Sequence, residues 1–349
     1  MGPIRGAGQA WRLRAGENVA APGIDRAGRG AGVISLHDRR AEAAFDAIAG
    51  DDPQIRAAKE RAARFARSDL PVLLLAETGT GKDLFARAIH EAGRSGRPFI
   101  AINCGTLPAE LLESELFGYA PGAFTGARAR GQEGKLAAAD GGTLFLDEVA
   151  EMPPALQALL LRVLEDGSYS RIGEVQQRST RFRLVCATCR DLPALVEAGA
   201  FRRDLFHRIN GAILELPPLR ARTDLPALVT ALLAAAAREQ GTPAPTVAPA
   251  ALEALCAHDW PGNVRELKMA LRYALVLADG GTIDPHHLPA LHRSPGLPQA
   301  RARRQAEAEA LASALAQAKG NLSEAARILG VARTTLYRMI ARHGLRPAP

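Results

Sequence analysis

Short apolar runs alternate with longer amphipathic stretches through the middle of the chain. The apolar runs have the length of buried strands and occupy residues 71–76, 99–103, 143–147, 182–188 and 212–216. Apolar positions at helical spacing lie between them, at residues 83–92, 109–117, 153–165, 191–198 and 201–208. Strands that alternate with helices form a parallel sheet covered by helices on both faces. We therefore predict an α/β domain of three layers over residues 41–220.

The pattern becomes entirely helical after the paired prolines that follow the last strand. Helical spacing continues to about residue 290, which predicts an all-α lid subdomain over residues 221–291. Residues 292–302 contain several Pro and Gly residues and are predicted to be a linker, and a last helical unit fills residues 303–349. Residues 1–40 are rich in Gly, Ala and Arg without periodicity, which is typical of a disordered segment or the remnant of a linker.

A glycine-rich turn follows the first predicted strand and leads into a helix. It consists of Ala76, Glu77, Thr78, Gly79, Thr80, Gly81, Lys82 and Asp83. A strand, a glycine loop, a lysine and a helix in this order form a phosphate-binding loop, in which backbone N–H groups and the lysine contact the phosphates. Ala76 and Asp83 depart from the general pattern G-x-x-x-x-G-K-S/T, so the turn taken alone also fits an ordinary strand-to-helix connection.

A second motif supports the phosphate-binding interpretation. The apolar strand at 143–147 ends in two adjacent acids, Asp147 and Glu148. At a nucleotide site one carboxylate can hold Mg²⁺ while the other polarises the attacking water. Because this motif follows the glycine loop within the same predicted sheet, we expect an ATPase of the AAA+ type that uses ATP and Mg²⁺.

Charge is distributed unevenly along the chain. Residues 292–349 hold ten Lys or Arg against three Asp or Glu, whereas residues 41–291 hold 27 against 31. A basic terminal unit on a nearly neutral body is typical of an attached nucleic-acid-binding module. The alternative interpretation of such a basic run is a solvated surface that binds no nucleic acid.

The basic unit has the pattern of a helix-turn-helix. Its small core is predicted to consist of Ala326, Leu329, Val331, Leu336 and Ile340. Its second helix would lie in the major groove and present Arg333, Thr334, Thr335 and Arg338 to double-stranded DNA. Leu311 and Leu315, one turn apart on the preceding helix, are candidates for pairing two such units. A helical hairpin that packs on the body is the alternative structure.

Several ordered motifs in the body resemble one family. The loop Gly122-Ala123-Phe124-Thr125-Gly126-Ala127 follows Glu113-Ser114-Glu115-Leu116-Phe117-Gly118, and Trp260-Pro261-Gly262-Asn263-Val264-Arg265-Glu266-Leu267 lies in the predicted lid. These motifs are similar to those of the sigma-54-dependent transcription activators, or bacterial enhancer-binding proteins, and in detail to those of the acetoin-catabolism type. The resemblance covers about residues 47–280, and the C-terminal unit resembles the Fis-type DNA-binding domain.

The resemblance implies roles for the residues of the nucleotide site. Gly79, Thr80, Gly81 and Lys82 would hold the phosphates, Asp147 would hold Mg²⁺ and Glu148 would activate water. Asn103 resembles a switch residue that restrains this glutamate. Arg202 and Arg208 resemble arginine fingers supplied to a neighbouring subunit, and Arg265 resembles a second sensor on the lid. Cys189 stands where an asparagine is usual in the family.

The loop Gly122–Ala127 would contact sigma-54. Phe124 and Thr125 lie between glycines that let the backbone hinge, which favours an exposed loop over a core position. The family therefore implies a partner, the sigma-54 RNA polymerase holoenzyme, whose promoter DNA the protein would open. We expect a homo-oligomeric ring, a hexamer, bound to an upstream DNA site.

Two other functions remain as alternatives. In one, the chain is an AAA+ DNA-binding regulator or initiator in which ATP is only an assembly switch, and in the other it is a protein-unfolding AAA+ subunit. Neither needs the loop at 122–127, so this loop favours the activator. No apolar run is long enough to cross a membrane, no signal peptide is recognisable and the four cysteines fit a reducing compartment, so we expect a cytoplasmic protein without a membrane partner. A receiver or sensing domain does not fit ahead of residue 41, from which we expect either a short form controlled in trans or a chain whose start was lost.

Substitution of Arg338 tests the helix-turn-helix prediction. Arg338→Ala should weaken site-specific binding by about 1–3 kcal/mol if its guanidinium contacts a base edge, and should lower the salt dependence by about one charge if it contacts a phosphate. Fluorescence anisotropy with a duplex selected from random DNA would measure both quantities. Site-specific binding that survives deletion of residues 303–349 would contradict the prediction.

Overall fold

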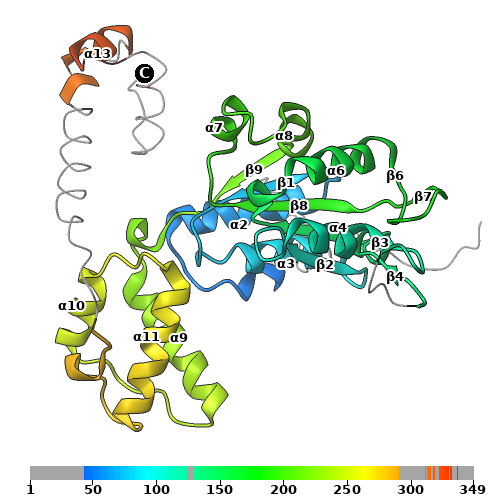
Figure 1. Cartoon of the computed structure of the whole chain (residues 1–349). Coiled ribbons are helices and arrows are strands. Elements are labelled where there is room, and N and C mark those ends of the chain that lie inside the picture. The colour runs from blue at the N-terminus through cyan, green and yellow to red at the C-terminus, as the bar shows by residue number, and fades with distance from the viewer. Residues whose placement is uncertain are drawn as a thin grey trace, which may run out of the picture.

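The computed structural model describes residues 43–124, 129–290 and, in the C-terminal unit, residues 311, 313–315, 317–318, 322–329, 331 and 336. A parallel sheet of five strands forms its centre, in the order β2-β5-β8-β1-β9 (Figure 1). The strands are β1 (Val72–Leu75), β2 (Phe99–Asn103), β5 (Thr143–Asp147), β8 (Arg183–Thr188) and β9 (Ala212–Glu215). The predicted parallel α/β fold is therefore confirmed.

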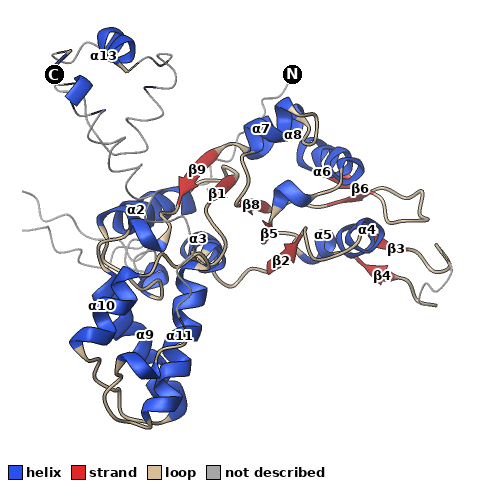
Figure 2. Ribbon diagram, turned by 60° about the vertical axis from the view of Figure 1, so that its left-hand side comes forward, coloured by secondary structure: helices blue, strands red, loops and turns tan. Residues whose placement is uncertain are grey.

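Helices cover both faces of the sheet (Figure 2). One face packs against α2 (Pro53–Ala66) and α3 (Lys82–Arg94). The other packs against α4 (Ala109–Phe117), α5 (Lys135–Ala138), α6 (Pro154–Asp166), α7 (Leu192–Glu197) and α8 (Arg203–Ile209). Successive strand residues alternate between the two cores, because side chains of a strand point to opposite faces. In β5, for example, Leu144 and Leu146 enter one core and Phe145 the other.

Two small antiparallel hairpins were not predicted. One pairs β3 (Gly118–Tyr119) with β4 (Gln132–Glu133), and the other pairs β6 (Ser168–Tyr169) with β7 (Arg178–Ser179). Both lie at the end of the α/β subdomain that is remote from the lid (Figure 1). Strands of two residues carry too little periodicity to be recognised in a sequence.

The lid has a core of its own. It consists of η2 (Leu219–Ala221), α9 (Leu225–Gln240), α10 (Pro249–Ala257), α11 (Asn263–Ala278) and η3 (Pro285–His287). Trp260 is fully buried in this core, and its indole N–H donates to the Leu255 carbonyl at 2.9 Å. Prolines occupy the first turn of α9 and α10, where the missing N–H leaves no helix bond unmade.

The described part of the C-terminal unit includes α13 (Leu322–Ile328) and a small apolar cluster. Ala326 and Leu336 are buried in this cluster, as predicted, with Leu329 and Val331 packed against it. Leu311 is fully buried in the same cluster and Leu315 partly. The two leucines proposed to pair two units therefore pack within one. Ile340 and the predicted DNA-contacting residues Arg333, Thr334, Thr335 and Arg338 lie outside the described residues.

A search of the described helices finds none with the length and apolar character needed to cross a membrane.

Arg183 is a charged residue inside the α/β core. Only 1% of its surface is exposed, and its two terminal nitrogens donate to the carbonyls of Ala66 at 2.7 Å and Phe65 at 2.6 Å. These carbonyls belong to the last turn of α2, where the regular helical bonds end. The Phe65 carbonyl also accepts the Ser68 N–H at 2.9 Å, so Arg183 is a further donor there and the donor of the Ala66 carbonyl. Burial lowers the pKa of Arg183 to about 10, so the guanidinium stays charged at neutral pH. A strand residue thus caps a helix on one face of the sheet.

Arg183→Ala should lower the free energy of unfolding by about 3 kcal/mol, because it leaves a cavity and removes the donor of the Ala66 carbonyl. Urea unfolding of the full chain would measure the loss. Arg181→Ala is the matched control, since Arg181 is exposed two residues earlier, and it should change stability by less than about 0.5 kcal/mol. Equal stabilities of the two variants would contradict this assignment.

Candidate nucleotide-binding site

A cleft of about 670 Å³ opens at the carboxyl ends of the parallel strands. The phosphate loop contributes Thr78, Gly79, Gly81, Lys82 and Asp83 to its walls. The strand ends contribute Asn103, Asp147, Glu148 and Cys189, and the first turns of α11 contribute Val264, Arg265 and Lys268. This volume is within the range of small-molecule sites, and the edge of a parallel sheet is where such sites form.

The backbone of the loop explains its sequence. Gly79 and Gly81 have φ angles of +80° and +104°, in the left-handed region that glycine adopts without strain. Gly81 is also the N-cap of α3, so Lys82 begins that helix. Ala76 has no positive φ and continues the sheet, with its N–H donating to the Thr188 carbonyl at 3.1 Å. A glycine is therefore not needed at position 76, and this departure from the general pattern is accommodated.

Lys82 is almost buried and is paired with the two acids of the second motif. Its Nζ lies 2.6 Å from Glu148 Oε1 and 3.7 Å from Asp147 Oδ1. Burial raises the pKa of Asp147 above its usual value, and the charge of Lys82 opposes this shift. A phosphate that enters the loop must therefore compete with Glu148 for the lysine.

Asn103 contacts Asp147 and not Glu148. Strands β2 and β5 place Asn103 directly beside Asp147 in the sheet, and the Asn103 amide donates to Asp147 Oδ2 at 3.0 Å. Glu148 has a φ of +49°, which turns its side chain toward Lys82. Its other oxygen accepts the backbone N–H of Cys189 at 3.3 Å. In this state the glutamate is thus restrained by Lys82 and the Cys189 backbone, and the predicted Asn103–Glu148 contact is not observed.

Asp147 is the residue best suited to hold Mg²⁺. This ion prefers oxygen ligands and commonly binds through one or two carboxylates together with substrate phosphates and water. The Asp147 carboxylate is half-buried at the cleft and is oriented by bonds from Asn103 and from the Glu148 N–H at 3.0 Å. The donor set therefore fits a magnesium ion bound together with phosphate oxygens.

The predicted arginine fingers do not reach the cleft of their own chain. Arg202 pairs with Asp204 at 2.7 Å, and Arg208 donates to the Leu164 carbonyl at 2.6 Å. Neither lines the described cleft, whereas Arg265 does. Arg265 is exposed, and its backbone N–H donates to the Gly79 carbonyl at 3.2 Å.

The loop after β3 is described as far as Phe124. Gly122 has a φ of +74°, and an added Cβ there would meet no atom within 4 Å, so the loop is open at this point. Phe124 is 46% exposed and its ring packs edge-on against Tyr119, with centroids 5.0 Å apart. A Cβ added at Gly173, in the second hairpin, would lie 2.8 Å from the Cβ of Ala123, so the loop passes close to this hairpin. Thr125, Gly126 and Ala127 lie outside the described residues.

Sequence reasoning missed three features of this region. Lys268 lines the cleft one turn after Arg265, and the spacing of two cations on one helix face could have revealed it. Arg220 and Asn263 bond the phosphate loop from the lid side, which no local pattern indicates. The hairpin of β6 and β7 supports the loop after β3, because the Ala120 N–H donates to the Ile172 carbonyl at 2.9 Å.

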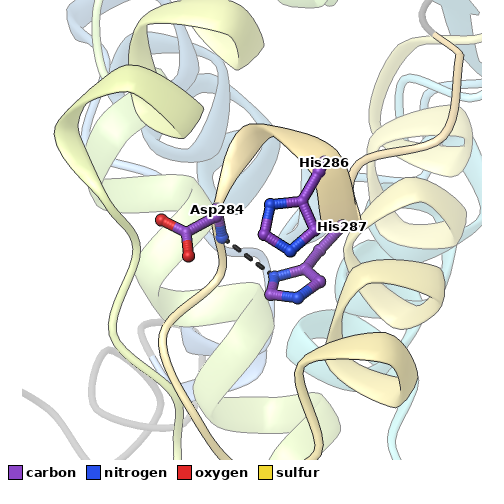
Figure 3. Close-up of side chains that lie close together, drawn as sticks. All are labelled: Asp284, His286 and His287. Atoms are coloured by element: carbon purple, nitrogen blue, oxygen red, sulfur yellow. Dashed lines mark hydrogen bonds between the residues drawn. The ribbon is translucent and has the colours of Figure 1, made fainter.

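Another group of possible metal ligands lies in the lid, at Asp284, His286 and His287 (Figure 3). The Asp284 N–H donates to His287 Nδ1 at 3.0 Å. A neutral imidazole that accepts at Nδ1 carries its proton at Nε2, so neither nitrogen of His287 is available to a metal. The Asp284 carboxylate in turn accepts the His287 backbone N–H, which completes a capping box. We therefore assign these residues to the capping of η3.

Family models match most of the chain. Residues 48–215 match the sigma-54 interaction domain, residues 220–305 match the AAA+ ATPase lid domain and residues 302–343 match the bacterial regulatory proteins of the Fis family. The transcriptional regulatory protein ZraR of Klebsiella oxytoca is 42% identical over 306 residues, which cover 84% of this chain and 68% of ZraR. The chain belongs to the sigma-54-dependent transcription activators.

Other relatives support the same family assignment. The acetoin catabolism regulatory protein of Cupriavidus necator is 43% identical over 320 residues, covering 86% of this chain and 48% of that protein. The Nif-specific regulatory protein of Azotobacter vinelandii is 47% identical over 238 residues, covering 68% of this chain and 45% of that protein. The matches thus span about half the length of these two regulators. The crystal structure of NtrX from Brucella abortus in complex with ATP is similar, with 32% identity, a TM-score of 0.64 and coverage of 85% of this chain and 69% of that one.

Substitution of Glu148 tests the pairing seen in the activator's cleft. Glu148→Gln removes the carboxylate that is paired with Lys82 and competes with phosphate for it. The variant should therefore bind ATP about fivefold more tightly, or by roughly 1 kcal/mol. It should also abolish turnover, because an amide cannot accept a proton from water. Equilibrium binding of a fluorescent ATP analogue and steady-state phosphate release measure the two effects. Glu197→Gln, on the exposed face of α7, is the control, and normal turnover in Glu148→Gln would refute the role of this residue.

Proposed function

We propose that this activator hydrolyses ATP and uses the energy to remodel the sigma-54 RNA polymerase holoenzyme at promoters. The observation that carries the proposal is the convergence of Lys82, Asp147 and Glu148 on one cleft. A buried lysine with two acids is the set of charges that phosphate binding, Mg²⁺ binding and water activation require. Arg265 and Lys268 add positive charge from the lid side of the same cleft.

The residues of the cleft divide the reaction among them. The loop N–H groups and Lys82 would bind the phosphates, and Mg²⁺, when bound at Asp147, would neutralise charge on the phosphate oxygens. Entry of the phosphates frees Glu148 from Lys82, after which its carboxylate can accept a proton from the attacking water. Asn103 keeps the Asp147 carboxylate oriented during this exchange.

Catalysis would be completed by a neighbouring subunit. Arg202 and Arg208 lie on or next to α8, and their guanidinium groups bond their own chain outside the cleft. A guanidinium that stabilises the transferred phosphoryl group must lie within contact of it, so these arginines could act only on the site of another copy. This supports a homo-oligomeric ring, which we propose to be a hexamer.

Helix α4 connects the cleft with the proposed sigma-54 contact. Strand β2 ends at Asn103 in the cleft, α4 follows, and its C-cap Gly118 begins β3 and the loop 122–127. The second hairpin holds the base of this loop through Ile172, whose N–H donates to the Gly118 carbonyl at 2.9 Å. A conformational change at Asp147 or Asn103 would therefore reach the loop through a single helix, α4. The C-terminal unit, through Arg333, Thr334, Thr335 and Arg338, would bind the upstream DNA site.

Substitution of Thr125 tests the coupling. Thr125→Ala should leave ATP hydrolysis within about twofold of the wild type, because it changes none of the described residues that line the cleft. It should prevent the ring from retaining sigma-54 in the presence of ADP–aluminium fluoride and from opening a sigma-54 promoter. Native gel shifts and permanganate footprinting would measure these two outcomes.

Thr230→Ala, on the exposed face of α9, is the matched control and should retain both activities. Full promoter activation by Thr125→Ala would instead favour a DNA-binding regulator for which ATP is an assembly switch.

A further inference from the structure

Glu77 lies in the phosphate loop, but its carboxylate faces the lid. Its two oxygens accept both terminal nitrogens of Arg220, with Nη1 at 2.6 Å from Oε2 and Nη2 bonded to Oε1. Among the described residues the cleft is lined by the adjacent Thr78 and not by Glu77. Arg220 belongs to η2, the short helix that joins the last strand to the lid. The pair therefore bridges the joint between the two subdomains, and its bond to Glu77 raises the pKa of Arg220.

Asn263 contacts the same part of the loop from the start of α11. It is fully buried, and its amide nitrogen lies 3.3 Å from Glu77 Oε2 and 3.0 Å from the Thr78 carbonyl. Its amide oxygen accepts the Leu219 N–H at 2.7 Å. The residue has a φ of +53°, a conformation that asparagine tolerates better than most residues. One side chain thus ties the loop, η2 and α11 together.

The lid also holds the loop backbone directly. The Thr78 carbonyl is bonded by Asn263, and the Gly79 carbonyl by the Arg265 N–H at 3.2 Å. In a trans peptide the N–H points opposite to the carbonyl, so the bond from Asn263 aims the Gly79 N–H away from the lid. A Cβ at Gly79 would lie 2.2 Å from the Gly262 carbonyl oxygen, so the two backbones are in contact without room for a side chain.

We infer that Arg220 is a positioning residue for nucleotide binding and acts through Glu77. The ion pair sets the orientation of the phosphate loop relative to the lid. It thereby places Arg265 and Lys268 of α11 in the lining of the same cleft as Lys82. Bidentate, charge-assisted bonds between arginine and carboxylate are strong and geometrically specific, which suits them to fixing two elements in one relative position. The inference rests on the proposed ATP binding at this cleft and assigns Arg220 a role within it.

Three variants of the full chain test this role. Arg220→Ala and Glu77→Gln should each raise the dissociation constants of fluorescent ATP and ADP analogues, and the KM for ATP, by about tenfold. The kcat at saturating ATP should stay within about threefold, because neither side chain contacts the phosphates or the water. Arg220→Lys keeps the charge but loses the fork geometry, so an intermediate loss of about threefold is expected. The double variant should bind no more weakly than Arg220→Ala, since the two residues act as one unit.

The control is Arg272→Ala, which removes an ion pair with Glu239 that lies within the lid and does not touch the loop. Its nucleotide affinity should equal that of the wild type. If Arg220 had a structural role alone, Arg220→Ala would have a lower melting temperature but the nucleotide affinity and KM of the wild type. Arg220→Lys would then show no intermediate loss of affinity. If Arg220→Ala fails to fold, Arg220→Lys and Glu77→Gln carry the test.

Unchanged affinity and KM in Arg220→Lys and Glu77→Gln, with a wild type that binds ATP, would overturn this inference and leave the proposed function intact. A wild type that binds no nucleotide, with Lys82→Ala behaving identically, would overturn both.

Discussion

All five strands of the central sheet run in the same direction, so their carboxyl ends meet along one edge. Both faces of the sheet are buried under helices, which leaves this edge as the place where polar side chains can gather without entering a core. Asn103 and Asp147 are the last residues of their strands at this edge, and the phosphate loop and Cys189 follow directly after theirs. The arrangement of the nucleotide site is therefore a consequence of parallel pairing.

Charge at this edge is balanced within the protein. A lysine as buried as Lys82 is costly unless it is paired, and Glu148 and Asp147 supply the partners. The same pairing engages the proposed water-activating carboxylate, which a phosphate bound at Lys82 would release. The stability of the buried lysine and the proposed restraint of Glu148 thus have one physical cause.

The lid is not an independent cover on this site. Its contacts with the phosphate loop involve backbone carbonyls, a buried asparagine and an ion pair, and at Gly79 they leave no room for a side chain. A lid attached so closely can respond to changes in the loop, and its α11 carries two cations, Arg265 and Lys268, that line the cleft. On the other side of the cleft, α4 gives a comparably short path to the loop proposed to contact sigma-54.

The sequence by itself determined the elements and the chemistry that depend on local pattern. Apolar runs located the five strands, and the glycines before Lys82 identified the phosphate loop, because left-handed φ angles require glycine at those positions. Tertiary structure alone decided which side chains meet. The register of β2 and β5 placed Asn103 beside Asp147. Chain folding brought Arg220 into an ion pair with Glu77, although the two lie 143 residues apart in the sequence. No periodicity encodes such pairs, because they depend on how distant segments pack, and a two-residue strand such as β3 is stabilised only by the partner it finds in space.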